Sequence, residues 1–173
     1  MSERAGEASR YHDCPAGRHW GPRGAAGVLA WTQANGRVYV LLALRSHEVQ
    51  HGGTWSTIGG AIDAGESPWQ AAARELREEV EGIHPADGLI TASWTEPCPA
   101  GCGWAYSTFM LQVPALVPVR VRPGRSSWET VTVAWVPLDR VAARRRLHPG
   151  LQAAWPRLAR FIEAELAPWP ALR

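Results

Sequence analysis

The chain has 173 residues and a mass of 18.9 kDa, a length typical of a single domain. With 46% hydrophobic and 20% charged residues, its composition excludes a disordered protein. No apolar run approaches the roughly 18 residues that a membrane span needs, and the polar N-terminal segment lacks the hydrophobic region of a signal peptide. We therefore expect a cytoplasmic protein without a membrane partner, with a flexible N-terminus at residues 1–12 and a single domain with C-terminal helices at residues 13–173.

The acidic residues are distributed unevenly along the sequence. All 18 basic residues are arginines, and 16 acidic residues leave a formal net charge of +2. Six acidic residues lie between positions 63 and 81 beside only two arginines, so the rest of the chain holds 16 arginines against 10 acids, a balance of +6. An acidic centre in basic surroundings suits a metal site for an anionic substrate, although a solvated acidic helix face gives the same pattern. The six acidic residues are Asp63, Glu66, Glu75, Glu78, Glu79 and Glu81.

The first part of the chain predicts a β-hairpin followed by a loop. Residues 25–31 form an apolar run typical of a buried strand, and Ala34-Asn35-Gly36 is a turn sequence. Residues Arg37–Arg45 then alternate between two faces, which predicts the second strand. Residues 46–66 are rich in glycine and serine and predict a loop.

The strongest helix signal begins at Ser67. Ser67 is a favourable N-cap, Pro68 suits the first helical position, and Gln70 completes a capping box. Gly82 stands where a left-handed C-terminal residue belongs. The pattern predicts a helix over residues 68–81 whose apolar face packs on a sheet. That face comprises Trp69, Ala73, Leu76 and Val80.

Strands and then helices are predicted in the rest of the chain. Pro156 suits a helix start, which leaves residues 151–155 as a separate short turn. The order of strands, helix, strands and helices predicts an α+β domain built in layers. The predicted strands are 88–94, 104–113, 117–121 and 129–136, and the predicted helices are 138–146 and 156–165.

Three carboxylates of the predicted helix share one face. At about 100° per residue, Glu75, Glu78 and Glu79 fall within one arc opposite the apolar face. Like charges at this spacing repel by a few tenths of a kcal/mol per pair, and a hard divalent cation such as Mg²⁺ would offset the repulsion. Arg74 precedes Glu78 by four residues and could steer one carboxylate. The glycines of the preceding loop would let a backbone carbonyl approach the cation.

These residues belong to a longer motif. Residues 60–79 read Gly60-x5-Glu66-x7-Arg74-Glu75-Leu76-x-Glu78-Glu79. This run resembles the Nudix box, the signature of the Nudix hydrolases, and matches every charged position of that signature at the family spacing. The resemblance implies a Nudix-type α/β/α sandwich with a mixed β-sheet in a single domain.

The chain departs from the motif at two positions. The family expects a Gly-aliphatic ending one residue after the paired glutamates, whereas here Val80-Glu81 precede Gly82-Ile83. We expect this one-residue slip to alter the end of the helix and not the metal site, because it lies downstream of every implied ligand. Ile58 stands where relatives commonly have proline before the two glycines.

The resemblance implies hydrolysis of a nucleoside diphosphate linked to another moiety, with Mg²⁺ as the cofactor, which Mn²⁺ could replace. Glu75 would hold or deprotonate the attacking water, and Arg74 would orient a glutamate. Gly60 and Glu66 would support the junction of loop and helix. Divalent cations neutralise diphosphate charge and lower the pKa of bound water, so the chemistry agrees with the implied roles. The implied metal ligands are Glu75, Glu78, Glu79 and the carbonyl oxygen of Gly59.

Residues outside the box could complete the site. Some Nudix enzymes use a further glutamate as a ligand or base, and Glu129 is the best-placed candidate, although a solvated glutamate at a strand start is an equal alternative. Arg45 ends a strand just before the loop and could bind a phosphate, or lie free at the surface. Aromatic rings could stack on a nucleobase, although most of the ten tryptophans must serve the core or its rim. The aromatic candidates are Trp55, Trp104 and Tyr106.

The three cysteines carry a second, weaker signal. Cys98-x3-Cys102 could form a zinc site with Cys14, His12 and His19, but free thiols in a reducing compartment are the default interpretation. Residues 14–17 and 98–101 have the same sequence, Cys-Pro-Ala-Gly, which is too short to establish a repeat.

The substrate class stays open at this stage. A nucleoside triphosphate, including an oxidised one, and ADP-ribose or another nucleotide sugar are equally compatible with the sequence. Pro97, fifteen residues after Gly82, resembles the downstream proline of the ADP-ribose group. The alternative is a non-catalytic nucleotide-binding sensor with the same fold, although both paired glutamates are present. The arginine clusters lack interleaved aromatics, so we expect a nucleotide-type small molecule as the partner and no nucleic acid, and a homodimer is compatible with the sequence.

Overall fold

The computed structural model describes residues 11–124 and 128–166. Residues 1–10 of the predicted flexible N-terminus lie outside this part, while Tyr11 and His12 belong to the first strand. None of the helices in the described ranges is long and apolar enough to cross a membrane. The elements, in chain order, are β1 (Tyr11–Cys14), β2 (Gly17–Trp20), β3 (Ala25–Ala34), β4 (Arg37–Arg45), β5 (Trp55–Ser56), β6 (Ile58–Ala61), α2 (Pro68–Glu79), β7 (Val80–Glu81), η1 (Pro85–Asp87), β8 (Leu89–Pro97), β9 (Ala105–Gln112), β10 (Arg120–Val121), β11 (Thr130–Pro137), α3 (Leu138–Val141) and α4 (Pro149–Leu166).

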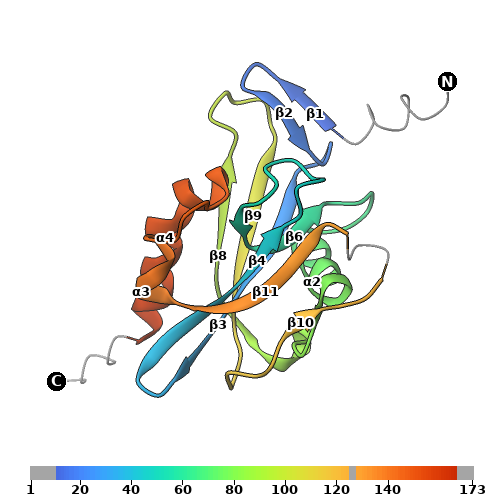
Figure 1. Cartoon of the computed structure of the whole chain (residues 1–173). Coiled ribbons are helices and arrows are strands. Elements are labelled where there is room, and N and C mark those ends of the chain that lie inside the picture. The colour runs from blue at the N-terminus through green and yellow to red at the C-terminus, as the bar shows by residue number, and fades with distance from the viewer. Residues whose placement is uncertain (1–10, 125–127, 167–173) are drawn as a thin grey trace.

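A mixed sheet forms the centre of the molecule (Figure 1). Its strand order is β11-β4-β3-β9-β8, with β5 paired to β4 and β6 paired to β3. Strands β3 and β9 run parallel, whereas the other neighbours are antiparallel. The predicted β3–β4 hairpin is confirmed, but only residues 31–34 of β3 pair with β4. Residues 25–28 of β3 pair with β6, which therefore lies inside the sheet beside the start of β3.

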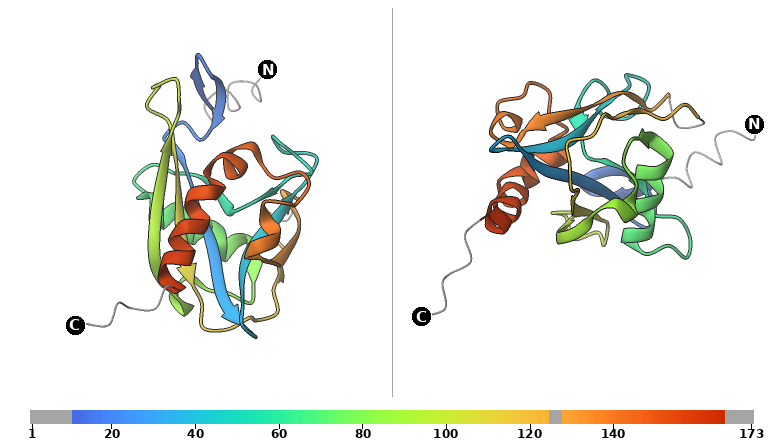
Figure 2. Two further views of the ribbon diagram at one scale, coloured as in Figure 1. Left: turned by 90° about the vertical axis from the view of Figure 1, so that its left-hand side faces the viewer. Right: turned by 90° about the horizontal axis from the view of Figure 1, so that it is seen from below.

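Helices cover both faces of the sheet, as the right-hand view of Figure 2 shows for α2 and α4. One core cluster lies beneath α2 and includes Val28 and Leu41. The other lies beneath α3 and α4 and includes Leu29 and Leu42. Successive residues of one strand thus reach opposite cores, because side chains alternate across a sheet. The α+β sandwich with a mixed sheet is confirmed.

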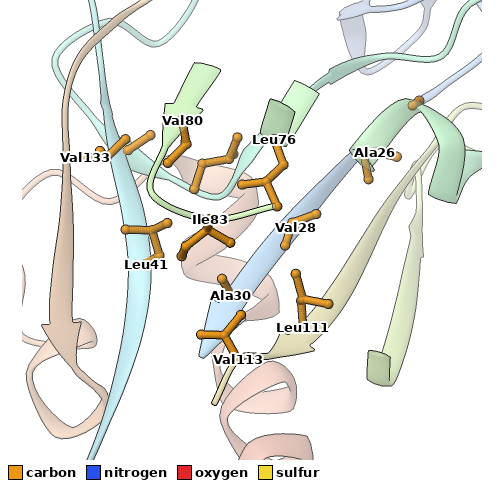
Figure 3. Close-up of a cluster of buried hydrophobic side chains, with 14 residues drawn as sticks. Ala26, Val28, Ala30, Leu41, Leu76, Val80, Ile83, Leu111, Val113 and Val133 are labelled. Atoms are coloured by element: carbon orange, nitrogen blue, oxygen red, sulfur yellow. The ribbon is translucent and has the colours of Figure 1, made fainter. Parts of the chain in front are cut away.

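Helix α2 begins where the sequence predicts. The hydroxyl oxygen of Ser67 accepts a hydrogen bond from the backbone N–H of Gln70 at 3.2 Å, and the Gln70 side chain accepts from the Ser67 N–H at 2.7 Å. This capping box satisfies two backbone donors that a helix start leaves unpaired. Figure 3 shows Leu76 and Val80 directed into the cluster between the helix and the sheet. Burial of these side chains holds the polar face of α2 in a fixed orientation.

The end of α2 differs from the prediction. The helix stops at Glu79, two residues early, because Val80 and Glu81 pair with the short strand β10. Gly82 has the expected positive φ, at 102°, but it follows strand β7 instead of capping the helix. The one-residue slip in the motif therefore falls in β7 and the bend after it, beyond the glutamates of α2.

Several short strands lie in segments whose sequence predicts a loop or a flexible terminus. The predicted loop at residues 46–66 contains β5 and β6, and residues 11–20 form the β1–β2 hairpin. Strand β6 carries two adjacent glycines, which have low β propensity, so its sequence resembles a loop. The predicted strand 117–121 is reduced to β10, and β3 is three residues longer than predicted.

The predicted helix at residues 138–146 is largely absent. Only α3 is helical, and Arg146 has a positive φ of 63°, a conformation that no right-handed helix contains. The backbone N–H of Trp55 donates to the Arg146 carbonyl at 2.8 Å, and Leu147 forms an isolated bridge with Trp55, so contacts with β5 hold the end of this segment in a non-helical turn.

Helix α4 begins at Pro149, seven residues before the predicted start, so Pro156 lies inside it and residues 151–155 are helical. The Nδ1 atom of His148 accepts from the Gly150 N–H at 3.1 Å and caps the helix. Burial lowers the pKa of His148 to about 4, which keeps this ring neutral and able to accept. One buried stripe spans both sides of Pro156, and its packing offsets the lost backbone hydrogen bond. The stripe consists of Leu151, Ala154, Trp155, Leu158 and Ile162.

We predict that Pro156→Ala raises the free energy of unfolding by about 1–2 kcal/mol, because alanine supplies the N–H that proline lacks inside a helix. The Pro156 side chain is exposed, so little packing is lost. Pro149→Ala is the matched control, since the first helical position has no partner for an N–H, and we expect no gain there. Urea unfolding followed by circular dichroism measures both variants, and equal effects would contradict this account of α4.

Candidate active site

Helix α2 carries three glutamates of different burial on its polar face; Glu75, Glu78 and Glu79 are called the box glutamates below. The Glu78 side chain is 47% exposed and that of Glu75 only 13%. Glu79 is 5% exposed, which is rare for a glutamate. Two carboxylates one helical turn apart are therefore withdrawn from water, and each needs compensation for the lost hydration.

Glu79 receives little of this compensation from the chain itself. The hydroxyl of Thr130, at the start of β11, donates to Glu79 Oε2 at 2.8 Å. Burial raises the pKa of Glu79 to about 8, and the charges of Glu75 and Glu129 raise it as well, while Thr130 and the charge of Arg45 lower it. Within the described ranges, no ion pair reaches Glu79. A negative charge at this position is thus destabilised unless a further cation approaches.

Glu75 lies between Arg74 and strand β6. Arg74 Nη1 donates to Glu75 Oε1 at 2.7 Å. Burial raises the pKa of Glu75; Arg74 opposes this effect, and the charges of Glu78 and Glu129 add to it. A Cβ atom at Gly60 would overlap the Glu75 carboxylate. The glycine therefore lets the carboxylate lie directly against the backbone of β6.

Arg74 joins the segment before α2 to the helix. It forms two parallel hydrogen bonds with Glu66, from Nε to Oε1 at 2.8 Å and from Nη2 to Oε2 at 3.0 Å. Its Nη2 also donates to the carbonyl of Ala61 at 2.9 Å, and its Nη1 lies 3.6 Å from Glu78 Oε2. The bonds from Arg74 lower the pKa of Glu66, so this pair stays ionised. One guanidinium group thus fixes β6, the loop and the glutamates relative to one another.

Gly59 lies in β6 opposite Gly27 of β3. The hydroxyl of Tyr106 shares a 2.8 Å hydrogen bond with the Thr57 hydroxyl and lies against both glycines. Burial raises the pKa of Tyr106 to about 12, so the phenol stays protonated. Tyr106, predicted as a ring for base stacking, therefore contacts the glycine-rich strand through its hydroxyl.

Arg45 and Glu129 lie close to the box glutamates although they are far apart in sequence. Pairing of β4 with β11 places Arg45 opposite Thr130, and the Ser46 N–H donates to the Glu129 carbonyl at 2.8 Å. The charges of Arg45 and Glu129 both act on the pKa of Glu79, which indicates their proximity to it. The sheet register therefore unites these two predicted residues with the helix.

The two tryptophans predicted to stack on a base have other contacts. The guanidinium of Arg144 covers the Trp55 ring, 3.9 Å from its centroid. Trp104 stacks on His19 with ring centroids 4.4 Å apart and donates to the Gly21 carbonyl at 3.0 Å. Both rings therefore pack against neighbouring elements of the fold, and their candidate role in stacking on a base stays a prediction.

Two hydroxyl groups near the carboxylates were not found from the sequence. Thr57 precedes β6 and binds Tyr106, and Thr130 binds Glu79. Threonine carries no signal for such roles, and the only sequence hint was that Thr130 directly follows Glu129.

The donor set fits a hard divalent cation. Mg²⁺ and Mn²⁺ prefer carboxylate and carbonyl oxygens, which the box glutamates and the backbone of β6 supply. The charge of the buried Glu75 raises the pKa of the buried Glu79, and a cation bound by these carboxylates would offset that repulsion. The residues present are therefore compatible with binding of a hard divalent cation.

Comparison with known proteins places the chain in a family. A family model described as the NUDIX domain matches residues 21–159. The chain is also similar to a solved Nudix hydrolase from M. smegmatis, RenU, with 32% sequence identity and a TM-score of 0.68. That similarity covers 92% of this chain and 97% of the RenU chain.

Curated relatives are similar over much of the chain. A nucleoside triphosphate pyrophosphatase/Nudix hydrolase fusion protein of Bifidobacterium longum is 37% identical over 90% of this chain. A putative 8-oxo-dGTP diphosphatase 3 of Mycobacterium tuberculosis is 36% identical over 81% of it. The chain spans 31% and 63% of the lengths of these two relatives. The match to the family model and the similarity to RenU over nearly the whole of both chains show that this chain belongs to the Nudix hydrolase family.

Proposed function

We propose that this protein is a Mg²⁺-dependent pyrophosphohydrolase that cleaves a diphosphate linkage in a nucleoside diphosphate derivative. The observation that carries the proposal is the pair of buried carboxylates, Glu75 and Glu79, held one helical turn apart, of which only Glu75 forms an ion pair with Arg74 in the described part of the chain. Such a pair is costly for folding, and a divalent cation that neutralises phosphate charge would offset this cost.

The box glutamates and the carbonyl oxygen of Gly59 would hold the cation. When bound, Mg²⁺ neutralises phosphate charge and lowers the pKa of bound water. Arg74 binds Oε1 of Glu75 and so holds the carboxylate that would bind the cation and hold or deprotonate the attacking water. The charge of Glu129 raises the pKa of both Glu75 and Glu79, and Glu129 is our second candidate to accept the proton of the attacking water. Arg74 positions Glu75 and is held in turn by Glu66.

A nucleoside triphosphate is the substrate class that we favour, and an oxidised purine such as that of 8-oxo-dGTP is its first candidate. The names of the B. longum and M. tuberculosis relatives support this class. Arg45, whose charge lowers the pKa of Glu79, is our candidate to contact a phosphate beyond the box glutamates. ADP-ribose and other nucleotide sugars are the alternative.

We predict that Glu79→Gln lowers kcat at saturating Mg²⁺ by about a hundred-fold or more, because the amide removes a charged metal ligand. The fold should persist or become more stable, since a buried charge is lost and the amide oxygen can still accept from Thr130. Hydrolysis assays and thermal unfolding of the same preparation measure both effects. Glu81→Gln is the matched control, because Glu81 forms its ion pair with Arg120 of β10. Full turnover in Glu79→Gln would remove Glu79 from the site.

A second prediction concerns the backbone next to Glu75. We expect Gly60→Ala to lower kcat by about ten-fold, because the new Cβ displaces the Glu75 carboxylate from its place on β6. The control is Gly124→Ala, where a Cβ meets no atom within 4 Å. Steady-state kinetics of the two variants would show equal rates if the contact between Glu75 and β6 had no role.

The substrate class is tested with a panel assayed with Mg²⁺: dGTP, 8-oxo-dGTP, ADP-ribose and a nucleotide sugar. We expect the highest kcat/KM for 8-oxo-dGTP, with nucleoside monophosphate and pyrophosphate as products. Faster cleavage of ADP-ribose would overturn the triphosphate assignment and keep the hydrolase. Nucleotide binding without any product would instead support a sensor.

A further inference from the structure

A second group of ligand-type side chains lies outside the carboxylate site, where the β1–β2 hairpin meets the ends of β8 and β9. One sulfur or nitrogen atom from each of its four side chains lies within 4.8 Å of all the others. Figures 1 and 2 show the hairpin beside the β8–β9 connection, although some 80 residues of chain separate them. The group, called the thiol–imidazole cluster below, consists of Cys14, His19, Cys98 and Cys102.

The two halves of the cluster have the same local structure. Cys14 and Cys98 each begin a Cys-Pro-Ala-Gly turn whose glycine has a positive φ. In each turn the N–H of the alanine donates to the cysteine sulfur, at 3.3 Å from Ala16 to Cys14. Hydrogen bonds of this type stabilise a sulfur that carries negative charge. The tetrapeptide repeat, too short to interpret from sequence, thus builds two equivalent turns that face each other.

The distances within the cluster match those of a tetrahedral site. Bonds of about 2.3 Å to sulfur and about 2.0 Å to nitrogen, at tetrahedral angles, separate two sulfurs by roughly 3.8 Å and a sulfur from a nitrogen by roughly 3.5 Å. The sulfur atoms of Cys14 and Cys98 are 3.6 Å apart, and Cys14 Sγ lies 3.2 Å from His19 Nε2. A small adjustment of the side chains therefore admits one ion at their centre.

We propose that the thiol–imidazole cluster is a structural zinc site that fastens the β1–β2 hairpin to the β8–β9 connection. Three cysteines and one histidine at this separation form a closed Cys₃His set, and soft thiolate ligands select zinc over Mg²⁺. Zinc binding replaces the thiol protons, which pass to the solvent. The site is therefore separate from the Mg²⁺ centre in both ligands and chemistry.

Neighbouring residues orient the ligands. The ring of His19 stacks on Trp104, whose Nε1 is anchored to the carbonyls of Trp20 and Gly21. His12 reaches the Cys102 carbonyl with its Nε2 at 3.1 Å, so it supports the cluster from outside and is not a ligand. Trp104 therefore holds the His19 ring against the cluster.

The proposed zinc would stabilise the β1–β2 hairpin. The β1–β2 hairpin is a separate two-stranded sheet of four residues per strand, and such hairpins are marginally stable alone. Zinc bound only by the folded form would stabilise the hairpin in place by mass action. After the hairpin the chain enters β3, the central strand of the main sheet. Zinc that holds the hairpin in place would therefore also stabilise the start of β3.

The first test is the metal content of the intact protein. The protein is purified under reducing conditions without a metal-affinity step, incubated with Zn²⁺, dialysed and analysed by inductively coupled plasma mass spectrometry. We expect about one zinc per chain. Co²⁺ in place of zinc should give the absorption bands of tetrahedral cobalt with thiolate ligands. A zinc content near zero after reconstitution would overturn the proposal. A Cys14–Cys98 disulfide that resists the reductant and so prevents zinc binding would overturn it as well.

Two histidine variants distinguish the proposed zinc ligand, His19, from its neighbour His12. We expect His19→Gln to weaken zinc binding by about ten-fold or more in competition with a chromophoric chelator, whereas His12→Gln retains it. Equal affinities in the two variants would contradict the assigned ligand set. Cys98→Ser should lose zinc and melt at a lower temperature; if it does not fold, the histidine pair still decides the question. Because zinc content is measured without substrate, its result is independent of the proposed hydrolase activity.

Discussion

Burial of like charges on one turn of α2 is the constraint on which the site depends. Glu75 and Glu79 are held out of water by packing of the opposite face of the helix against the sheet, through residues such as Leu76. The hydrophobic contacts supply the free energy that keeps the two carboxylates together. The resulting electrostatic stress is the feature that a divalent cation and a polyphosphate would relieve.

Contacts from the loop and from the strands hold the two carboxylates in place. Arg74 connects the helix to Ala61 and Glu66, so movement of the loop would shift the Glu75 carboxylate. The glycines of β6 allow the strand to approach both β3 and Glu75 closely. Strand β11 adds Thr130 from the far side. The carboxylates therefore sit where three elements meet, which is an arrangement that favours precise positioning.

The sequence predicted local features well and tertiary contacts poorly. The cap at Ser67 and the arc of glutamates depend on residues within one helix, so their spacing determines them. Strand β6 could not be predicted, because its glycines are explained only by the neighbours they admit. The predicted start of α4 was wrong, because packing of the buried side chains outweighs the preference of Pro156 for the first position of a helix. The stacking of Trp104 on His19 could not be predicted, because the two residues are 85 positions apart in the sequence.

The most direct test of the central claim is a crystal structure of the protein soaked with Mn²⁺, with data collected to locate manganese by its anomalous scattering. Mn²⁺ takes the same oxygen ligands as Mg²⁺ but scatters strongly enough to be identified. The account predicts an anomalous peak bounded by the carboxylates of Glu75, Glu78 and Glu79. A structure with manganese bound only elsewhere, and with these three carboxylates free of metal, would contradict it.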